Sequence, residues 1–323
     1  PAGPLQATLM PHPNEVYLEH LRIARAIPLW SLGRQRYHPT TWSDMAGRRN
    51  ELLLTASRDN APLITMRGED SLFAQIARMA WGAWAEVDGK AILAAIQRVQ
   101  RREVGSNLLL LALLGMTYRW GEHASFPAEV RQPLEASILG FRYGDQDANS
   151  EVMELHGEAT ALLFQACELL AGQLYSQRAF GDGQAGEWHR ARAEEKIKQW
   201  VANFGAFGSA AWNSPASIEQ EIVALVHLCD FAEAQDVFEM ATVALDKTIF
   251  TLALHSWHGV LGVAHQRGSA SMVKSGLLQP SAPICNLLWG TGAKGGMLDA
   301  EGALITLGPE LYFKLMDGIA SAM

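Results

Sequence analysis

The sequence predicts an all-α protein, an incomplete (α/α)n toroid of helical hairpins with a short loop-rich C-terminal segment. Three observations support this prediction. Ala and Leu abound whereas runs of β-branched residues are few, which favours helices. Apolar residues recur at three- and four-residue spacing along most of the chain. Strongly apolar segments alternate with segments that are charged on part of their surface, as an inner and an outer ring of helices would produce.

The chain has 323 residues, of which 49% are hydrophobic and 19% charged, and this is ample for a large core. We expect a single toroid domain over residues 1–323. Its core of αα-hairpins spans 101–255, and 256–323 form the loop-rich end. The N-terminal helices within 1–100 either complete the toroid or pack beside it.

The first part of the chain contains several predicted helices. An amphipathic segment over 16–27 ends at Pro28, because proline cannot continue a helix. Residues 106–120 are apolar almost all round, which is typical of a buried helix. Further helices are predicted over 42–57, 71–81, 90–101 and 127–139.

Two predicted helical hairpins follow. The first joins 150–174 to 187–204, and the second joins 217–232 to 234–253. The leading helix of the first hairpin is richly apolar and its partner is strongly charged. Beyond Leu254 the sequence becomes rich in Gly, Ser and other small residues. There the sequence predicts loops over 255–276 and 293–308, short helices over 282–288 and 310–322, and a hairpin as an alternative within 296–308.

Charge and hydrophobicity exclude two classes of partner. The net charge is −8, with the acidic excess after residue 144, and no basic tract suited to phosphates appears. We therefore expect no nucleic-acid partner. The longest apolar run, around 108–116, is shorter than the roughly 20 residues of a membrane span, so we expect no membrane partner.

Neither the cysteines nor the glycine-rich stretch has the spacing of a metal-binding or nucleotide-binding motif. The three cysteines, Cys167, Cys229 and Cys285, are widely spaced among apolar residues and are interpreted as buried thiols. The glycine-rich stretch 290–296 lacks the spacing of a phosphate loop. We expect no metal and no cofactor. The chain begins at Pro1, which indicates a processed or excised product, and a secreted or periplasmic location is the expectation that fits it.

Several short motifs lie between residues 140 and 267. They are GFRY at 140–143, LF at 163–164, ELLAGQ at 168–173, WNSP at 212–215, LCDFA at 228–232, LALHS at 252–256, and the segment from Gly259 to His265-Gln-Arg267. With these motifs, residues 141–290 resemble the core of the (α/α)-barrel proteins among carbohydrate-active enzymes, notably polysaccharide lyases and related bacterial and fungal proteins. The resemblance implies a polysaccharide or oligosaccharide substrate.

The chain departs from this pattern at one position. Such relatives carry Ser/Thr-Glu-Asn-His at the start of the long inner helix, whereas this chain has Gly157-Glu158-Ala159-Thr160. Only the glutamate is retained. The C-terminal β-sandwich that is often attached to toroid lyases has no counterpart here.

The order of the helices predicts where polar residues gather. If 150–174 and 217–232 are both inner helices, they begin at the same end of the toroid, and the antiparallel helix 234–253 returns there. Helix N-termini present unpaired N–H groups and a positive dipole end, which suits a bound carboxylate. The residues expected at this mouth are Asp145, Asp147, His156, Glu158, Asn213, Ser214, Glu219, His255 and His258, with His265 and Arg267 in the loop that starts there.

Most of these residues also have a structural interpretation. Ser214 before Pro215 is a helix cap and a rigid turn, and Asn213 can form an Asx-turn. Glu219 lies early in its helix and complements the helix dipole, whether or not it also has a functional role. His255 and His258 share a helical face if the helix continues that far, but no third metal ligand with suitable spacing is near.

The preferred chemistry is β-elimination on a uronic-acid glycan. Arg267 and Asn213 would neutralise the substrate carboxylate, His255 or His258 would be the base, and Tyr143 would be the acid. The catalytic candidates are His258, His255, Tyr143, His156 and Glu158, and the substrate-binding candidates are Asn213, Arg267, His265, Trp212, Glu219 and Asp147. We expect Tyr143, His156, Glu158, Asn213, His258 and Arg267 to line one cavity.

Two alternatives stay open. The first is glycoside hydrolysis by two carboxyl groups, one protonated and one ionised, drawn from Glu158, Asp147 and Glu219. The second is a non-catalytic helical scaffold or glycan-binding module. The histidine-rich mouth and the family resemblance favour the lyase, whereas the acidic balance of the chain disfavours it, because a polyanion prefers a positive groove.

Overall fold

The computed structural model describes residues 45–58, 72–103, 105–143, 157–264, 266, 276 and 279–291. Within these ranges the protein is predominantly helical, as predicted from the sequence. The predicted helices over 16–27 and 310–322, and the hairpin within 296–308, lie outside the described residues. The elements are α4 (Met45–Arg58), α5 (Leu72–Trp81), the 3-10 turn η1 (Trp84–Glu86), α6 (Gly89–Gln100), α7 (Ser106–Trp120), α8 (Ala128–Gly140), α9 (Glu158–Leu174), α10 (Gly186–Phe207), α11 (Pro215–Phe231), α12 (Gln235–His255), β1 (Ser256–Trp257), β2 (Val260–Leu261) and α14 (Ser281–Trp289).

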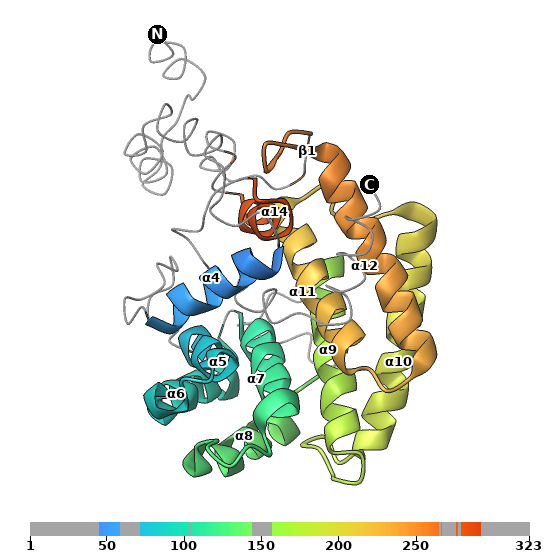
Figure 1. Cartoon of the computed structure of the whole chain (residues 1–323). Helices are drawn as coiled ribbons and strands as arrows, with labels where there is room; N and C mark the ends of the chain where they lie inside the picture. Colours follow the sequence, from blue (N-terminus) through green and yellow to red (C-terminus); the bar gives the residue numbers. More distant parts are fainter. Residues whose placement is uncertain are drawn as a thin grey trace, which may run out of the picture.

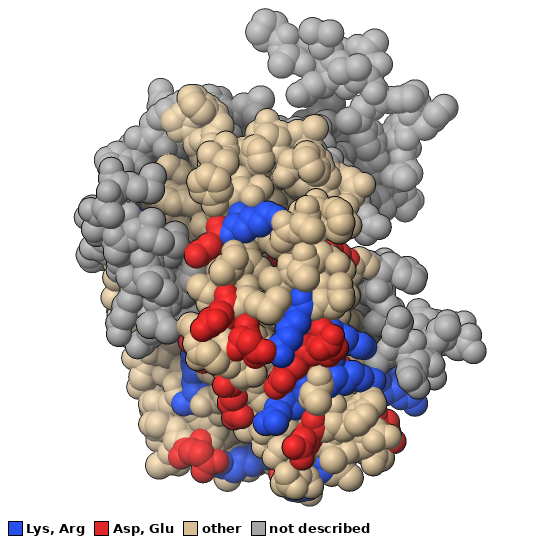
Figure 2. Space-filling model, turned by 90° about the vertical axis from the view of Figure 1, so that its right-hand side faces the viewer, with Lys and Arg blue, Asp and Glu red and all other residues tan. Residues whose placement is uncertain are grey.

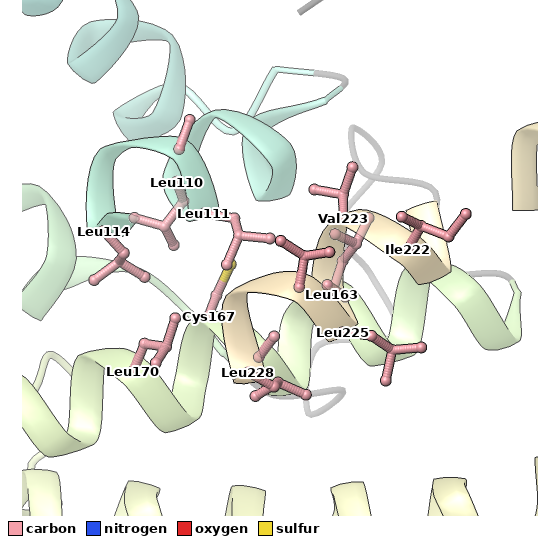
Figure 3. Close-up of a cluster of buried hydrophobic side chains, with 14 of the residues drawn as sticks. Leu110, Leu111, Leu114, Leu163, Cys167, Leu170, Ile222, Val223, Leu225 and Leu228 are labelled. Atoms are coloured by element: carbon pink, nitrogen blue, oxygen red, sulfur yellow. The ribbon is translucent and has the colours of Figure 1, made fainter. Parts of the chain in front are cut away.

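Helices α7, α9 and α11 pack against one another in the middle of the described structure (Figure 1). Their facing side chains form a cluster of buried hydrophobic residues, which Figure 3 shows. Leu111, Leu163 and Val223 belong to these three helices, and each is at most 1% exposed. Truncation of a leucine in such a site costs about 2–5 kcal/mol of stability, so this cluster anchors the fold.

Helices α10 and α12 form an outer layer on one side of this core (Figure 1). Helices α9 and α11 each bury twelve of seventeen residues, whereas α10 buries seven of twenty-two and α12 seven of twenty-one. Figure 2 shows this outer side, with acidic and basic side chains mixed over its lower part and few charges over its upper part. The predicted alternation of apolar and charged helices is therefore seen as an inner and an outer layer.

The first hairpin, α9–α10, is held by an unusually close backbone approach. A Cβ atom added at Gly172 of α9 would lie 2.6 Å from the Arg190 nitrogen and 2.6 Å from the Gly186 oxygen of α10. Only glycine leaves room for this approach. The spacing of the two helices therefore depends on Gly172, whatever the other side chains between them are.

Two predicted elements differ in the structure. The helix predicted over 150–174 is not continuous, because Gly157 has φ of 138° and ψ of 145°, and α9 begins only at Glu158. Glycine adopts this backbone conformation readily, whereas other residues do not. The loop predicted from residue 255 contains the β1–β2 hairpin, whose turn residues His258 and Gly259 both have positive φ, as a type I′ turn requires.

The second hairpin starts as the sequence indicates. Ser214 is the N-cap of α11, and its hydroxyl accepts a hydrogen bond from the Ser217 amide at 3.4 Å, with Pro215 in the first turn. No helix in the described ranges combines the length and the hydrophobicity needed to cross a membrane.

Helices α7 and α11 meet through a buried histidine. His227 of α11 lies against Gly115 of α7, and its Nδ1 donates to the Val223 carbonyl oxygen at 2.9 Å. Burial, with a smaller contribution from the positive charge of Arg119, lowers the pKa of His227 to about 4, although the hydrogen bond to Val223 opposes this shift. His227 is therefore a neutral core residue at neutral pH.

This contact gives a test of the α7–α11 packing. Gly115→Ala would place a Cβ atom 2.8 Å from His227 Nε2, so we expect it to destabilise the protein by about 1–3 kcal/mol, measured by chemical unfolding. Gly205→Ala in α10 is the matched control, since nothing lies within 4 Å of its added Cβ. It should stabilise the protein by about 0.5–1 kcal/mol through helix propensity. Stabilisation by both changes would contradict the packing described here.

Candidate functional site

Three helix ends meet at one end of the described structure (Figure 1). Helices α9 and α11 begin there, and α12 returns there because it runs antiparallel to α11. Two long-range hydrogen bonds join these ends. The Ala210 amide donates to Glu158 Oε2 at 2.6 Å, and the Gln266 amide donates to the Trp212 carbonyl oxygen at 3.0 Å. The loop between α10 and α11 is therefore the centre of this end.

The structure describes seven of the eleven predicted site residues. Tyr143, Glu158, Trp212, Asn213, Glu219, His255 and His258 are described, whereas Asp147, His156, His265 and Arg267 lie outside the described residues, as does Asp145. Six residues were expected to line one cavity. Four of them are described, namely Tyr143, Glu158, Asn213 and His258, and only these can be compared with the structure.

Glu158 is the first residue of α9 and lies at the mouth of a cleft of about 330 Å³. The cleft is lined by Glu158, Asn203, Phe207, Gly208, Ser209 and Ala210. The carboxylate accepts a hydrogen bond from the Ala210 amide and lies at the N-terminal end of α9. Its backbone oxygen accepts a hydrogen bond from Trp200 Nε1 at 3.1 Å, so the first turn of α9 is fixed.

Glu221 is a second carboxyl group beside this cleft, and the sequence analysis missed it. It lies in α11, is 1% exposed, and accepts a hydrogen bond from the Ser209 hydroxyl at 2.8 Å. Burial raises its pKa to about 7, the negative charge of Glu158 adds to the shift, and the Ser209 hydrogen bond opposes it. A glutamate inside the apolar run of α11 was the signal that could have identified it.

Glu219, the glutamate that the sequence analysis chose on α11, occupies a different position. It is 4% exposed and precedes Glu221 by two residues, a spacing that places two side chains on different sides of a helix. It is not among the described residues that line the cleft. The candidate carboxyl pair is therefore Glu158 and Glu221.

Trp212 and Asn213 lie in the same loop as Ser209 and Ala210. The Trp212 side chain is 63% exposed, and Phe207, which lines the cleft, is 86% exposed. Asn213 has φ of 47°, a left-handed conformation that asparagine tolerates better than most residues. Asn213 thus has a structural role in the turn that leads to Ser214.

His255 and His258 do not share a helical face, because α12 ends at His255 and His258 lies in the hairpin turn. The ring of His258 packs edge-on against Trp257, with 4.5 Å between ring centroids. His255 Nδ1 is buried and has no hydrogen-bond partner among the described residues. Neither histidine is among the described residues that line the Glu158 cleft.

Tyr143 lies away from this end, so the proposed acid of the lyase is not near Glu158. It is 5% exposed, and its hydroxyl donates to the Ile138 carbonyl oxygen at 2.8 Å. Its ring packs against His189, which bonds to Glu168, ten residues further along α9. At a rise of 1.5 Å per residue, Glu168 lies about 15 Å along α9 from Glu158. Burial raises the pKa of Tyr143 well above its usual value, so it is a poor acid.

A buried ionic network occupies this other part of the α9–α10 hairpin. His189 Nδ1 and Glu168 Oε1 are 2.8 Å apart, and Arg192 Nε donates to the same oxygen at 2.8 Å. His189 Nε2 lies 3.2 Å from Asp182, and Arg192 stacks over Trp188. Glu168 and His189 are enclosed, and their contacts join α9 to α10, so we interpret the network as structural.

The site has the features of an acid–base centre and no obvious metal centre. In the described part of the chain, no three His, Cys, Asp or Glu side chains are grouped as metal ligands. Glu158 is partly exposed and accepts a hydrogen bond from the Ala210 amide, whereas Glu221 is enclosed and burial raises its pKa to about 7. Two neighbouring carboxyl groups in such different surroundings can act as a base and an acid.

The raised pKa of Glu221 predicts how stability depends on pH. The unfolded state loses this proton near pH 4.5, whereas the folded state keeps it to about pH 7, so folding becomes less favourable as the pH rises between these values. The loss is at most about 3 kcal/mol. Glu221→Gln cannot ionise, so we expect it to be more stable than the wild type at pH 8 and similar at pH 4, measured by urea unfolding.

Glu158→Gln is the companion variant, because it removes the neighbouring charge. The pH range of the stability loss should then shift to lower pH. Parallel stability curves for the wild type and Glu221→Gln between pH 4 and pH 8 would show that Glu221 ionises normally.

Comparison of the sequence with family models, and of the chain with curated proteins and with solved structures, gives no significant match.

Proposed function

We propose that the chain is a carbohydrate-active enzyme that hydrolyses a glycosidic bond with the carboxyl groups of Glu158 and Glu221. The observation that carries the proposal is the pKa of about 7 for Glu221 next to a carboxylate that lines a cleft. Glycoside hydrolysis uses one protonated and one ionised carboxyl group, and a pKa of about 7 leaves Glu221 partly protonated at neutral pH.

Ser209 connects the proton of Glu221 to the cleft. The serine lines the cleft, and its oxygen lies 2.8 Å from Glu221 Oε1. When protonated Glu221 donates to this oxygen, the serine hydroxyl hydrogen is released toward the glycosidic oxygen of the substrate. Glu158, held by the Ala210 amide, then stabilises the positive charge that develops on the sugar ring or removes a proton from the attacking water.

The surroundings of the cleft suit a neutral sugar. Phe207 and Trp212 offer exposed aromatic faces, on which the apolar face of a sugar ring can pack. The described lining contains Glu158 and no Lys or Arg. An anionic uronate would be repelled by this site, and this favours the hydrolase over the lyase.

The toroid belongs to the same proposal. We propose that the inner helices α9 and α11 and the outer helices α10 and α12 belong to an incomplete (α/α)n toroid, and their division into two layers supports this. In such a ring, the inner helices begin at the mouth that receives the substrate, and Glu158 is at the first residue of one of them.

One observation favours the lyase as a second candidate. His255 Nδ1 is buried without a hydrogen-bond partner among the described residues, and an imidazole nitrogen can serve as a base. The proposed acid, Tyr143, is engaged with Ile138 in the core, so this reaction would need another acid.

The test is an incubation with neutral and uronate-containing glycans. A hydrolase releases new reducing ends from a neutral glycan, whereas a lyase produces the absorbance of an unsaturated sugar. We expect Glu158→Gln and Glu221→Gln to reduce the rate of reducing-end release by about a hundredfold or more. Activity of the wild type should fall as the pH rises through about 7, where Glu221 loses its proton.

Glu239→Gln is the matched control, since Glu239 lies exposed on α12 and bonds only to Gln235 among its described hydrogen-bond partners. It should keep full activity. Unchanged activity in Glu221→Gln would contradict the role of the pair. Absence of product from every glycan would contradict the enzyme and favour a glycan-binding scaffold.

A further inference from the structure

A second cleft lies between the C-terminal ends of α6 and α8, which pack side by side (Figure 1). Its volume is about 430 Å³, within the range of sites for small molecules. Its lining includes Val99, Arg102, Ser137, Gly140, Phe141 and Arg142. None of these residues belongs to the Glu158 cleft, so the two are separate sites.

Two charged side chains are among the described residues that line this cleft, and both are arginines. Arg102 comes from the end of α6, and Arg142 follows α8. The described lining contains no Asp or Glu. Guanidinium groups present planar pairs of N–H donors that match carboxylate and phosphate oxygens.

Ser137 supplies a polar group that the protein leaves unsatisfied. It is 4% exposed, lines the cleft, and its hydroxyl has no hydrogen-bond partner among the described residues. Hydroxyls in other helices of this chain bond to the carbonyl oxygen one turn earlier, as Thr117 does to Leu113 and Thr248 to Ala244. A buried unsatisfied hydroxyl is unfavourable, and a ligand oxygen in the cleft would satisfy it.

The backbone at Arg102 gives an independent indication. Helix α6 ends in a Schellman motif, in which the Arg102 amide donates to Val99 and the Glu103 amide donates to Arg98. Arg102 occupies the left-handed position, with φ of 56°, where glycine is the preferred residue. An arginine here strains the backbone, so its side chain is expected to have a use that offsets this strain.

We propose that this cleft binds a small oxyanion, a phosphate or carboxylate group attached to a compact apolar body. Arg102 and Arg142 bind the charged oxygens, and the Ser137 hydroxyl donates to one of them. Val99 and Phe141 contact the apolar part. The inference does not depend on the proposed hydrolase, because no residue of the Glu158 cleft takes part.

The test measures binding of phenyl phosphate and of benzoate to the full chain by isothermal titration calorimetry. The two probes share an aromatic body and differ in the oxyanion, so their relative affinities identify which group the cleft prefers. We expect the wild type to bind at least one of them, with binding that weakens at higher salt. Arg142→Ala should weaken Kd at least tenfold.

Arg102→Gly is the decisive variant, because it relieves the strained backbone and removes one guanidinium together. We expect Kd to weaken at least tenfold while Tm of the unliganded protein rises by about 2 °C. Arg101→Ala is the matched control: it removes the adjacent arginine, which is not among the described lining residues. Its Kd should stay within about twofold of the wild type.

Three outcomes would overturn the proposal. The wild type could bind neither probe. Arg102→Gly could retain wild-type affinity, in which case its side chain is not a ligand. Arg101→Ala could weaken binding as much as Arg102→Gly, which would indicate attraction by general positive charge rather than a built site.

Discussion

The enclosure of α9 by α7, α10 and α11 is the constraint on which the rest of the described structure depends. Gly172 allows the backbone of α10 to approach, and the apolar side chains of α7 and α11 cover the other sides. Where α9 carries a charge inside, at Glu168, α10 supplies His189 and Arg192. A buried carboxylate without such partners would be very costly. Only the first turn of α9 leaves this enclosure, so Glu158 is the acidic residue of α9 that lines a cleft.

The two buried glutamates Glu168 of α9 and Glu221 of α11 differ in the groups that surround them. Glu168 is in contact with two basic side chains, which balance its charge within the core. Glu221 is in contact with the Ser209 hydroxyl and is close to the charge of Glu158, and no basic group is among the causes of its pKa shift. Burial of a carboxyl group beside a like charge favours its protonated form. The difference between the ion-paired Glu168 and the proposed acid Glu221 thus arises from neighbours that belong to other helices.

The helices were largely predictable because their signals are local. The predicted limits of 106–120 coincide with α7, and those of α10, α11 and α12 differ by only a few residues from the structure. Gly157 and the His258–Gly259 turn were missed, because single residues with positive φ leave no periodic pattern. Tyr143 was expected to line a cavity with Glu158, but it packs beside His189 of α10. The Tyr143 ring packs into the core, and nothing in the neighbouring sequence indicates that this side chain is buried.

The sequence by itself determined the helical class, the pairing of apolar with charged helices and the end at which α9 and α11 begin. These properties follow from residue spacing and chain order, which act over a few turns of helix. The tertiary structure alone decided that Glu221, rather than Glu219, accompanies Glu158, and that Ser137 and Arg102 share a cleft. Proton affinity and hydrogen-bond satisfaction depend on burial and on groups from distant parts of the chain. Such contacts exist only once the helices are packed.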